Sequence, residues 1–175
     1  MTLIVETGAI VAGAESYIGV TDADTYYSNR GAAAWAALTT AQKEQALRKA
    51  TDYMLQIYRT LWKGVRMSAT QALDWPRAWV YLEPVVTGAN SDFPNLVADN
   101  IVPVEVKNAC AELALRASSA TLAADLTQQK KKVKVGPIET EYDTSTSQSV
   151  RYESVRAMLS PYLLKQQGTI SVVRS

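Results

Sequence analysis

The sequence predicts a mainly α protein: a compact helical bundle with a small β-hairpin and an extended C-terminal tail. Apolar residues recur at three- and four-residue steps in two long stretches, which is the period of a helix with one buried face. With 175 residues the chain can bury a core without disulfides or metal, and one domain is expected. We expect a helical domain over residues 1–165, including a hairpin near residues 130–143, and a tail over residues 166–175.

Two capping patterns predict the helices of the N-terminal half. Residues 1–20 read as extended or irregular chain, after which Thr21, with an acidic residue three positions on, predicts a short helix that ends near Gly31. Thr39 and Gln42 repeat this spacing ahead of the longest helix, which we expect to stop at Gly64. The apolar stripe of that helix consists of Leu47, Ala50, Met54, Ile57 and Leu61.

The middle of the chain is expected to hold a short helix, a long loop and a second core helix. Ser68 and Gln71 stand at capping-box spacing, and Pro76 keeps the helix in residues 68–78 short. Residues 80–102 have the composition of a loop. Pro103 fits the first turn of the next helix. Its apolar stripe consists of Val106, Ala109, Cys110, Leu113, Ala114 and Ala117.

The C-terminal third is predicted to contain the hairpin, a last helix and the tail. Alternating residues on both sides of Gly136 and Pro137 indicate two short strands within residues 133–142. A helix from about Tyr152 is expected to be kinked or split by Pro161, and residues 169–174 alternate as an extended segment. We interpret two tryptophans as packing anchors of the core, which is predicted to include Leu47, Met54, Ile57, Trp75, Trp79 and Leu113.

The chain contains no histidine and one cysteine, Cys110. Histidine is the usual general base near neutral pH and the commonest metal ligand, so hydrolases that use a histidine partner are excluded and structural zinc is not expected. Cys110 is interpreted as core packing. Asp22, Asp24 and Asp74 could bind a hard cation, but capping explains acids at helix starts more simply. We predict no enzyme, catalytic residue, metal or cofactor.

The sequence shows no feature of a membrane protein. Residues 1–13 lack the basic segment of a signal peptide and are interrupted by Glu6. No stretch approaches the ~18 apolar residues of a membrane span. We therefore expect a protein that is made and used inside a cell, without a membrane partner.

Charged residues fall into blocks of alternating sign. Residues 1–29 carry four acidic residues and no basic ones, whereas residues 30–66 carry seven basic and two acidic residues. Such blocks can make one face of a protomer complementary to another face of its neighbour, although they can equally be solvated faces. Arg59, Lys63 and Arg66 are our candidates for a contact between subunits.

Aromatic and basic residues also stand close together in the sequence, which is typical of sites that bind single-stranded nucleic acid by stacking and charge. The formal net charge of only +1 argues against this function, because proteins that bind through phosphates usually show a basic domain or stripe. The residues concerned are Trp62, Trp75 and Trp79 with Lys63, Arg66 and Arg77.

The chain resembles the DnaT-like single-stranded DNA-binding protein family of tailed bacteriophages and prophages, whose members are also regarded as head-tail adaptors. The similar segments are residues 8–17, 21–26, 50–53, 68–78, 102–103, 111–114, 134–142 and 159–163. The resemblance implies a structural virion protein, made in the bacterial cytoplasm, that forms a ring of twelve copies in the neck of the particle. Its partners would be the portal protein and a downstream neck or tail-completion protein. The alternative function is single-stranded DNA binding.

Two segments are candidates for binding these partners. Lys130, Lys131, Lys132 and Lys134 form a basic run that could be a solvated turn, contact an acidic patch on the portal or a neighbouring subunit, or touch packaged DNA in passing. The tail residues Ile170, Val172, Val173 and Arg174 could add a strand to the edge of a partner's sheet, or could be a frayed terminus.

Overall fold

The computed structural model describes residues 2–81, 96–123, 132–135, 138–141 and 150–164. Its helical elements are α1 (Val20–Ser28), α2 (Ala33–Ala36), α3 (Thr40–Tyr58), α4 (Val104–Ser119), α5 (Glu153–Leu159) and the 3₁₀ turn η1 (Ser160–Tyr162). Strand β1 (Val65–Arg66) pairs antiparallel with β2 (Arg77–Ala78), and β3 (Lys132–Val135) pairs antiparallel with β4 (Ile138–Glu141). The predicted mainly α class with a small hairpin is confirmed, and the expected tail over residues 166–175 lies outside the described residues.

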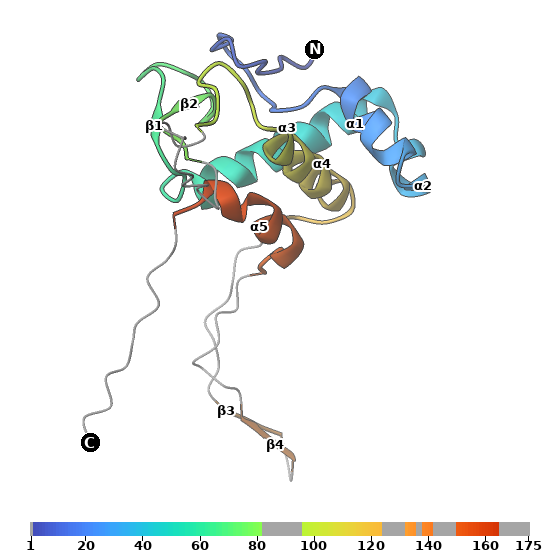
Figure 1. Ribbon diagram of the computed structural model, residues 1–175. Helices are drawn as coiled ribbons and strands as arrows, with labels where there is room; N and C mark the ends of the chain where they lie inside the picture. The colour runs from blue at the N-terminus through green and yellow to red at the C-terminus, as the bar shows by residue number, and fades with distance from the viewer. Residues whose placement is uncertain (1, 82–95, 124–131, 136–137, 142–149, 165–175) are drawn as a thin grey trace, which may run out of the picture.

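The helices form the body of the molecule. Helix α3 packs chiefly against α4, and α4 packs against α5 (Figure 1). Helices α1 and α2 lie toward the N-terminal end of α3, whereas β1 and β2 lie beyond its C-terminal end (Figure 1). The β3–β4 hairpin is drawn apart from the helices (Figure 1). The two ends of the helical body therefore carry different elements.

Helix α3 begins where the capping pattern predicted. The Thr39 hydroxyl oxygen accepts the backbone N–H of Gln42 at 3.3 Å, and the Gln42 side chain accepts the backbone N–H of Thr39 at 2.9 Å. This reciprocal pair satisfies two donors that the first turn of a helix leaves without partners. The helix ends at Tyr58, six residues before the predicted stop at Gly64.

The buried stripe of α3 differs from the prediction at one position. Leu47 and Met54 are fully buried, and the stripe continues through Tyr58, four residues after Met54. Tyr58 takes the inward position, so Ile57 lies on the flank of the helix with 44% of its surface exposed. The prediction that Ile57 is a core residue is therefore wrong.

Of the other predicted core residues, Trp75 and Leu113 are fully buried, whereas Trp79 is exposed. Its neighbour Val80 is fully buried, and the backbone of Trp79 has a left-handed φ of 60°, so residue 80 turns inward and the indole outward. The prediction that Trp79 belongs to the core is therefore wrong.

Two further local predictions need correction. Helix α1 begins at Val20 with Gly19 as its N-cap, so Thr21 lies inside the helix and does not cap it. Residues 68–78 form turns and strand β2, without a helix. The Gln71 side chain accepts the Ser68 N–H at 2.9 Å, as in a capping box, but its amide donates to the carbonyls of Leu73 and Pro76. These bonds close a compact turn instead of starting a helix.

The remaining elements follow the sequence closely. Helix α4 begins directly after Pro103, the hairpin forms on both sides of residues 136–137, and α5 gives way to η1 at Pro161. Cys110 is fully buried, with its Sγ 3.4 Å from the Thr51 hydroxyl, and burial raises the pKa of its thiol. Cys110 thus packs as part of the core. Within the described residues no helix is long and apolar enough to cross a membrane.

Four aromatic rings tie the end of α3 to the C-terminal part of the fold. The ring of Trp62 lies 5.9 Å from that of Tyr58 and 5.7 Å from that of Trp75, and Trp75 lies 5.6 Å from Tyr162 in η1. The last two pairs are edge-to-face, and such contacts stabilise a core beyond the area they bury. Burial also raises the pKa of Tyr58 to about 12. The cluster thus joins the turn after α3 to η1.

Replacing Thr39 by Ala removes the hydroxyl that accepts the Gln42 N–H, but keeps the backbone N–H that donates to the Gln42 side chain, and should lower the free energy of unfolding by about 1 kcal/mol. Thr40→Ala is the matched control, because Thr40 is the first helical residue and is exposed. Urea unfolding followed by circular dichroism would compare the two variants. Equal stabilities would contradict the role assigned to the Thr39 cap.

Candidate functional site

Trp79 is the most unusual surface residue among those described. Its side chain is 66% exposed, and its backbone φ of 60° lies in the left-handed region. A bulky side chain rarely adopts this conformation, which costs roughly 1–2 kcal/mol. Such strain persists only where surrounding contacts enforce it, and it is concentrated at functional sites. The contacts on both sides of Trp79 therefore bear on its function.

Gly64 allows β1 to approach the backbone beside Trp79. A Cβ atom on Gly64 would lie 2.1 Å from the Ala78 carbonyl oxygen and 3.1 Å from the Trp79 carbonyl carbon. The strand pairing beside it places Val65 opposite Ala78. Only glycine fits this close approach, so Gly64 and the β1–β2 pairing together fix the backbone on both sides of the exposed indole.

The buried guanidinium of Arg77 joins the turn after α3, at residues 63–64, to the turn before β2, at residue 74. We call this part of the molecule the Trp79 corner. The guanidinium donates to the carbonyl oxygens of Lys63 and Gly64, each at 2.8 Å, and to that of Asp74 at 3.3 Å. Burial lowers the pKa of Arg77. Removing the guanidinium would take the donor away from one buried and two partly buried carbonyl groups. Arg77 is therefore a structural clamp and is not available to a ligand.

Basic side chains flank Trp79, and the nearby acidic residue is already neutralised. Within residues 53–81 the one acidic residue is Asp74, against four basic residues. Asp74 is fully buried, and its Oδ1 accepts from Arg59 Nε at 3.1 Å. Arg59 itself is half exposed, so Asp74 orients a guanidinium whose outer edge faces solvent. The surroundings of Trp79 consequently carry net positive charge.

The other two predicted interface cations lie in the same region but also bond to the fold. Lys63 Nζ donates to the Pro161 carbonyl oxygen at 2.8 Å, and Arg66 Nη2 donates to the Gln71 carbonyl oxygen. Both side chains are partly exposed. The structure thus brings Arg59, Lys63 and Arg66 to one end of the molecule, where the turn after α3 and strand β1 position them.

Further exposed apolar side chains lie on the segments next to Trp79 in the sequence and on the segments paired with them. Strand pairing links Val65 to the backbone beside Trp79, and an isolated bridge links Tyr81 to Leu96. We call the exposed set Val65, Met67, Trp79, Tyr81 and Leu96 the Trp79 patch. An apolar patch bordered by polar groups marks an interaction site more often than an isolated exposed residue does.

The structure separates the three tryptophans that the sequence placed together. Trp62 and Trp75 are buried in the aromatic cluster, so neither can stack on a ligand. Trp79 alone of the three presents its ring to solvent. The nucleic-acid hypothesis therefore loses Trp62, Trp75 and the clamped Arg77, but it keeps Trp79 with Lys63 and Arg66.

The basic run is only partly within the described residues. The β3–β4 register places Lys132 opposite Glu141 and Lys134 opposite Glu139. The register therefore pairs each of these two lysines with an acidic residue, so the formal charges of the four residues balance. The other predicted partner-binding residues, which lie outside the described residues, are Lys130, Lys131, Ile170, Val172, Val173 and Arg174.

A comparison with known families identifies the family of this chain. The family described as "Putative DnaT-like ssDNA binding protein" matches residues 1–175. The chain belongs to this DnaT-like family. Its description names single-stranded DNA binding and no role in a virion. No curated protein and no solved structure matches the chain.

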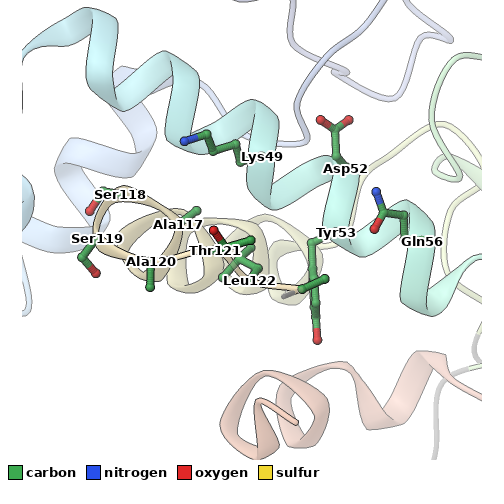
Figure 2. A pocket seen from close by; sticks show the side chains of 11 residues that line it. Lys49, Asp52, Tyr53, Gln56, Ala117, Ser118, Ser119, Ala120, Thr121 and Leu122 are labelled. Atoms are coloured by element: carbon green, nitrogen blue, oxygen red, sulfur yellow. The ribbon is translucent and has the colours of Figure 1, made fainter. Parts of the chain in front are cut away.

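A groove elsewhere on this DnaT-like chain is a weaker candidate. It has a volume of about 480 Å³ and lies between α3 and the residues that end and follow α4. Figure 2 shows the side chains of Lys49 and Asp52 pointing in different directions. Ligand sites have polar groups that converge on one position, and this groove lacks that arrangement. In the described part of the chain, no group of three or more His, Cys, Asp or Glu side chains could hold a metal ion.

Sequence reasoning missed Tyr81 as a possible member of the site of this DnaT-like protein. The signal was the order Trp79, Val80, Tyr81, in which an aliphatic residue separates two aromatic ones. Such alternation predicts that the middle residue is buried and the outer two share a face. The surrounding loop composition concealed this pattern.

Two glycines with the same left-handed backbone test the close approach at this corner. Gly31 and Gly64 both have a φ of 66°, but a Cβ atom on Gly31 would meet nothing within 4 Å. Gly31→Ala should therefore lower the free energy of unfolding only by the backbone strain, about 1 kcal/mol. Gly64→Ala should cost clearly more, because its Cβ would overlap the Ala78 carbonyl. Equal unfolding free energies in urea would refute the close packing of β1 against residues 78–79.

Proposed function

We propose that this protein binds single-stranded DNA on the Trp79 patch. The observation that supports this most directly is a strained, solvent-exposed indole directly after strand β2, on a stretch of chain that also carries the half-exposed Arg59. Proteins that bind single strands without reading sequence combine aromatic platforms for the bases with positive charge for the backbone. The family description names the same class of ligand.

Each part of the patch has a distinct role in this proposal. The indole of Trp79 stacks on an unpaired base, a contact worth roughly 1–3 kcal/mol. Arg59, held by Asp74 through Nε, presents its remaining N–H groups to phosphate, and Lys63 and Arg66 add charge beside it. Because the whole chain has a net charge of only +1, binding depends on this local concentration of cations.

Trp79→Gly should abolish most of the binding without unfolding the protein. Glycine tolerates the left-handed backbone, so the variant loses the ring and also loses the strain. Affinity for a labelled twelve-nucleotide thymidine oligomer, measured by fluorescence anisotropy, should fall roughly 5- to 100-fold. Trp79→Phe keeps an aromatic platform and should retain most of the affinity.

Ile57→Ala is the control, because Ile57 is an exposed apolar residue on α3 and not part of the Trp79 patch. Its affinity should equal that of the parent. For the parent, the logarithm of the binding constant should fall linearly with the logarithm of salt concentration. Unchanged binding by Trp79→Gly, or no salt-sensitive binding by the parent, would refute the proposal.

The second candidate is a head-tail adaptor, and the β3–β4 hairpin favours it. Its register pairs Lys132 with Glu141 and Lys134 with Glu139, so the formal charges of these four residues balance and give no local positive charge for DNA. A two-stranded hairpin is marginal by itself in water, and packing on a partner would stabilise it. In this role the chain would form a virion ring between the portal and a neck protein.

Deletion of residues 168–175 tests the adaptor candidate, because the tail would dock by strand addition. The truncated protein should attach less stably to portal rings, as measured by sedimentation of the mixed complexes. The full chain is the control. Equal attachment would remove the tail from the proposed interface, and absence of the full chain from mature particles would refute the adaptor role.

A further inference from the structure

The segment that follows β2 presents two aromatic rings to solvent. Trp79 is 66% exposed and Tyr81 is 40% exposed, while Val80 between them is completely buried. Buried and exposed positions alternate, so the two rings project away from the interior while Val80 anchors the segment in it. The sequence assigned no role to Tyr81, and the proposed function gives a stacking role to Trp79 alone.

Hydrogen bonding on one side and close packing on the other hold this segment. The Val97 N–H donates to the Val80 carbonyl oxygen at 2.9 Å, and Tyr81 forms a bridge with Leu96. On the other side, the position of a Gly64 Cβ would lie only 2.8 Å from Val80 Cγ2. The backbone that carries the two rings is therefore anchored to two other parts of the chain, and the rings are presented without the entropy cost of ordering a free loop.

We infer that the Trp79 patch takes two consecutive unpaired nucleotides, one base on Trp79 and the next on Tyr81. This inference rests on the proposed binding of single-stranded DNA and specifies the unit that the site recognises. Bases in a duplex have both faces covered by stacked neighbours, so a duplex cannot supply the two open faces. The ligand is thus a strand whose adjacent bases are separated.

The spacing of the two residues leads to a preference among sequences. Cα atoms two residues apart lie about 5–7 Å from each other, whereas bases in a stacked strand repeat every ~3.4 Å. A strand that occupies both rings must therefore unstack its adjacent bases. Thymines stack weakly on each other and adenines stack strongly, so a thymidine strand gives up less base-stacking free energy when it binds. Thymidine oligomers should bind more tightly than adenosine oligomers of equal length.

The protein-side test compares Tyr81→Ala with Tyr81→Phe in the full chain. Anisotropy with the labelled twelve-nucleotide thymidine oligomer should show roughly 5- to 100-fold weaker binding for Tyr81→Ala and little change for Tyr81→Phe. The preference for thymidine over the adenosine oligomer should shrink in Tyr81→Ala. Ile57→Ala again serves as the control for an unrelated exposed side chain.

A ligand-side test avoids any effect of substitution on folding. A thymidine oligomer in which every second nucleotide lacks its base offers no two consecutive bases. The unaltered protein should bind it more weakly than the intact oligomer, by about the factor lost in Tyr81→Ala. Equal binding of the two oligomers would overturn the two-base site.

The outcomes separate this inference from the proposed function. If Trp79→Gly loses binding while Tyr81→Ala and the alternating oligomer do not, single-stranded DNA binding stands and the two-base site is wrong. If the unaltered protein shows no salt-sensitive binding to any oligomer, both are wrong.

Discussion

The corner of the molecule that presents Trp79 depends on the buried guanidinium of Arg77. Its three bonds to the carbonyl oxygens of residues 63, 64 and 74 join the turn after α3 to the turn before β2. Carbonyl groups that are wholly or partly shielded from water require hydrogen-bond donors, and arginine supplies several from one rigid, planar group. The aromatic cluster of Trp62, Trp75 and Tyr162 lies beneath the same corner. The clamp and the cluster together hold the strained backbone.

Residues of one type have opposite roles in this fold because their surroundings differ. Trp35, Trp62 and Trp75 are buried, whereas Trp79 is the most exposed of the large apolar residues described. The cations divide in the same way, since Arg77 is buried as a clamp and Arg59 is half exposed against a buried carboxylate. A charged or aromatic residue near the site in sequence is therefore not necessarily part of the surface.

The two candidate functions use different parts of the chain. DNA binding rests on the Trp79 patch at the C-terminal end of α3, whereas adaptor assembly rests on the β3–β4 hairpin and the tail. An exposed apolar patch with nearby cations also suits a protein partner. Loss of DNA binding in the Trp79 variants therefore distinguishes the two functions better than the presence of the patch does. Both functions act by binding, and we propose no catalytic role for any residue.

The sequence by itself determined the elements whose signals are local. Thr39 and Gln42 mark the start of α3, Pro103 precedes α4, and Pro161 ends α5, because caps and prolines act within one helical turn. The sequence also pointed to the region of the candidate site, through its mixture of aromatic and basic residues. Which members of that mixture face solvent could not be read from it.

Only the tertiary structure decided that Trp75 is buried and Trp79 exposed, that Gln71 closes a turn instead of capping a helix, and that Ile57 lies outside the core. Arg77 became a clamp for the same reason. Each of these outcomes depends on contacts that are set by the packing of neighbouring segments, such as Gly64 against the backbone of residues 78–79. Periodicity and capping describe a segment in isolation, whereas burial depends on which other segment occupies the adjacent space.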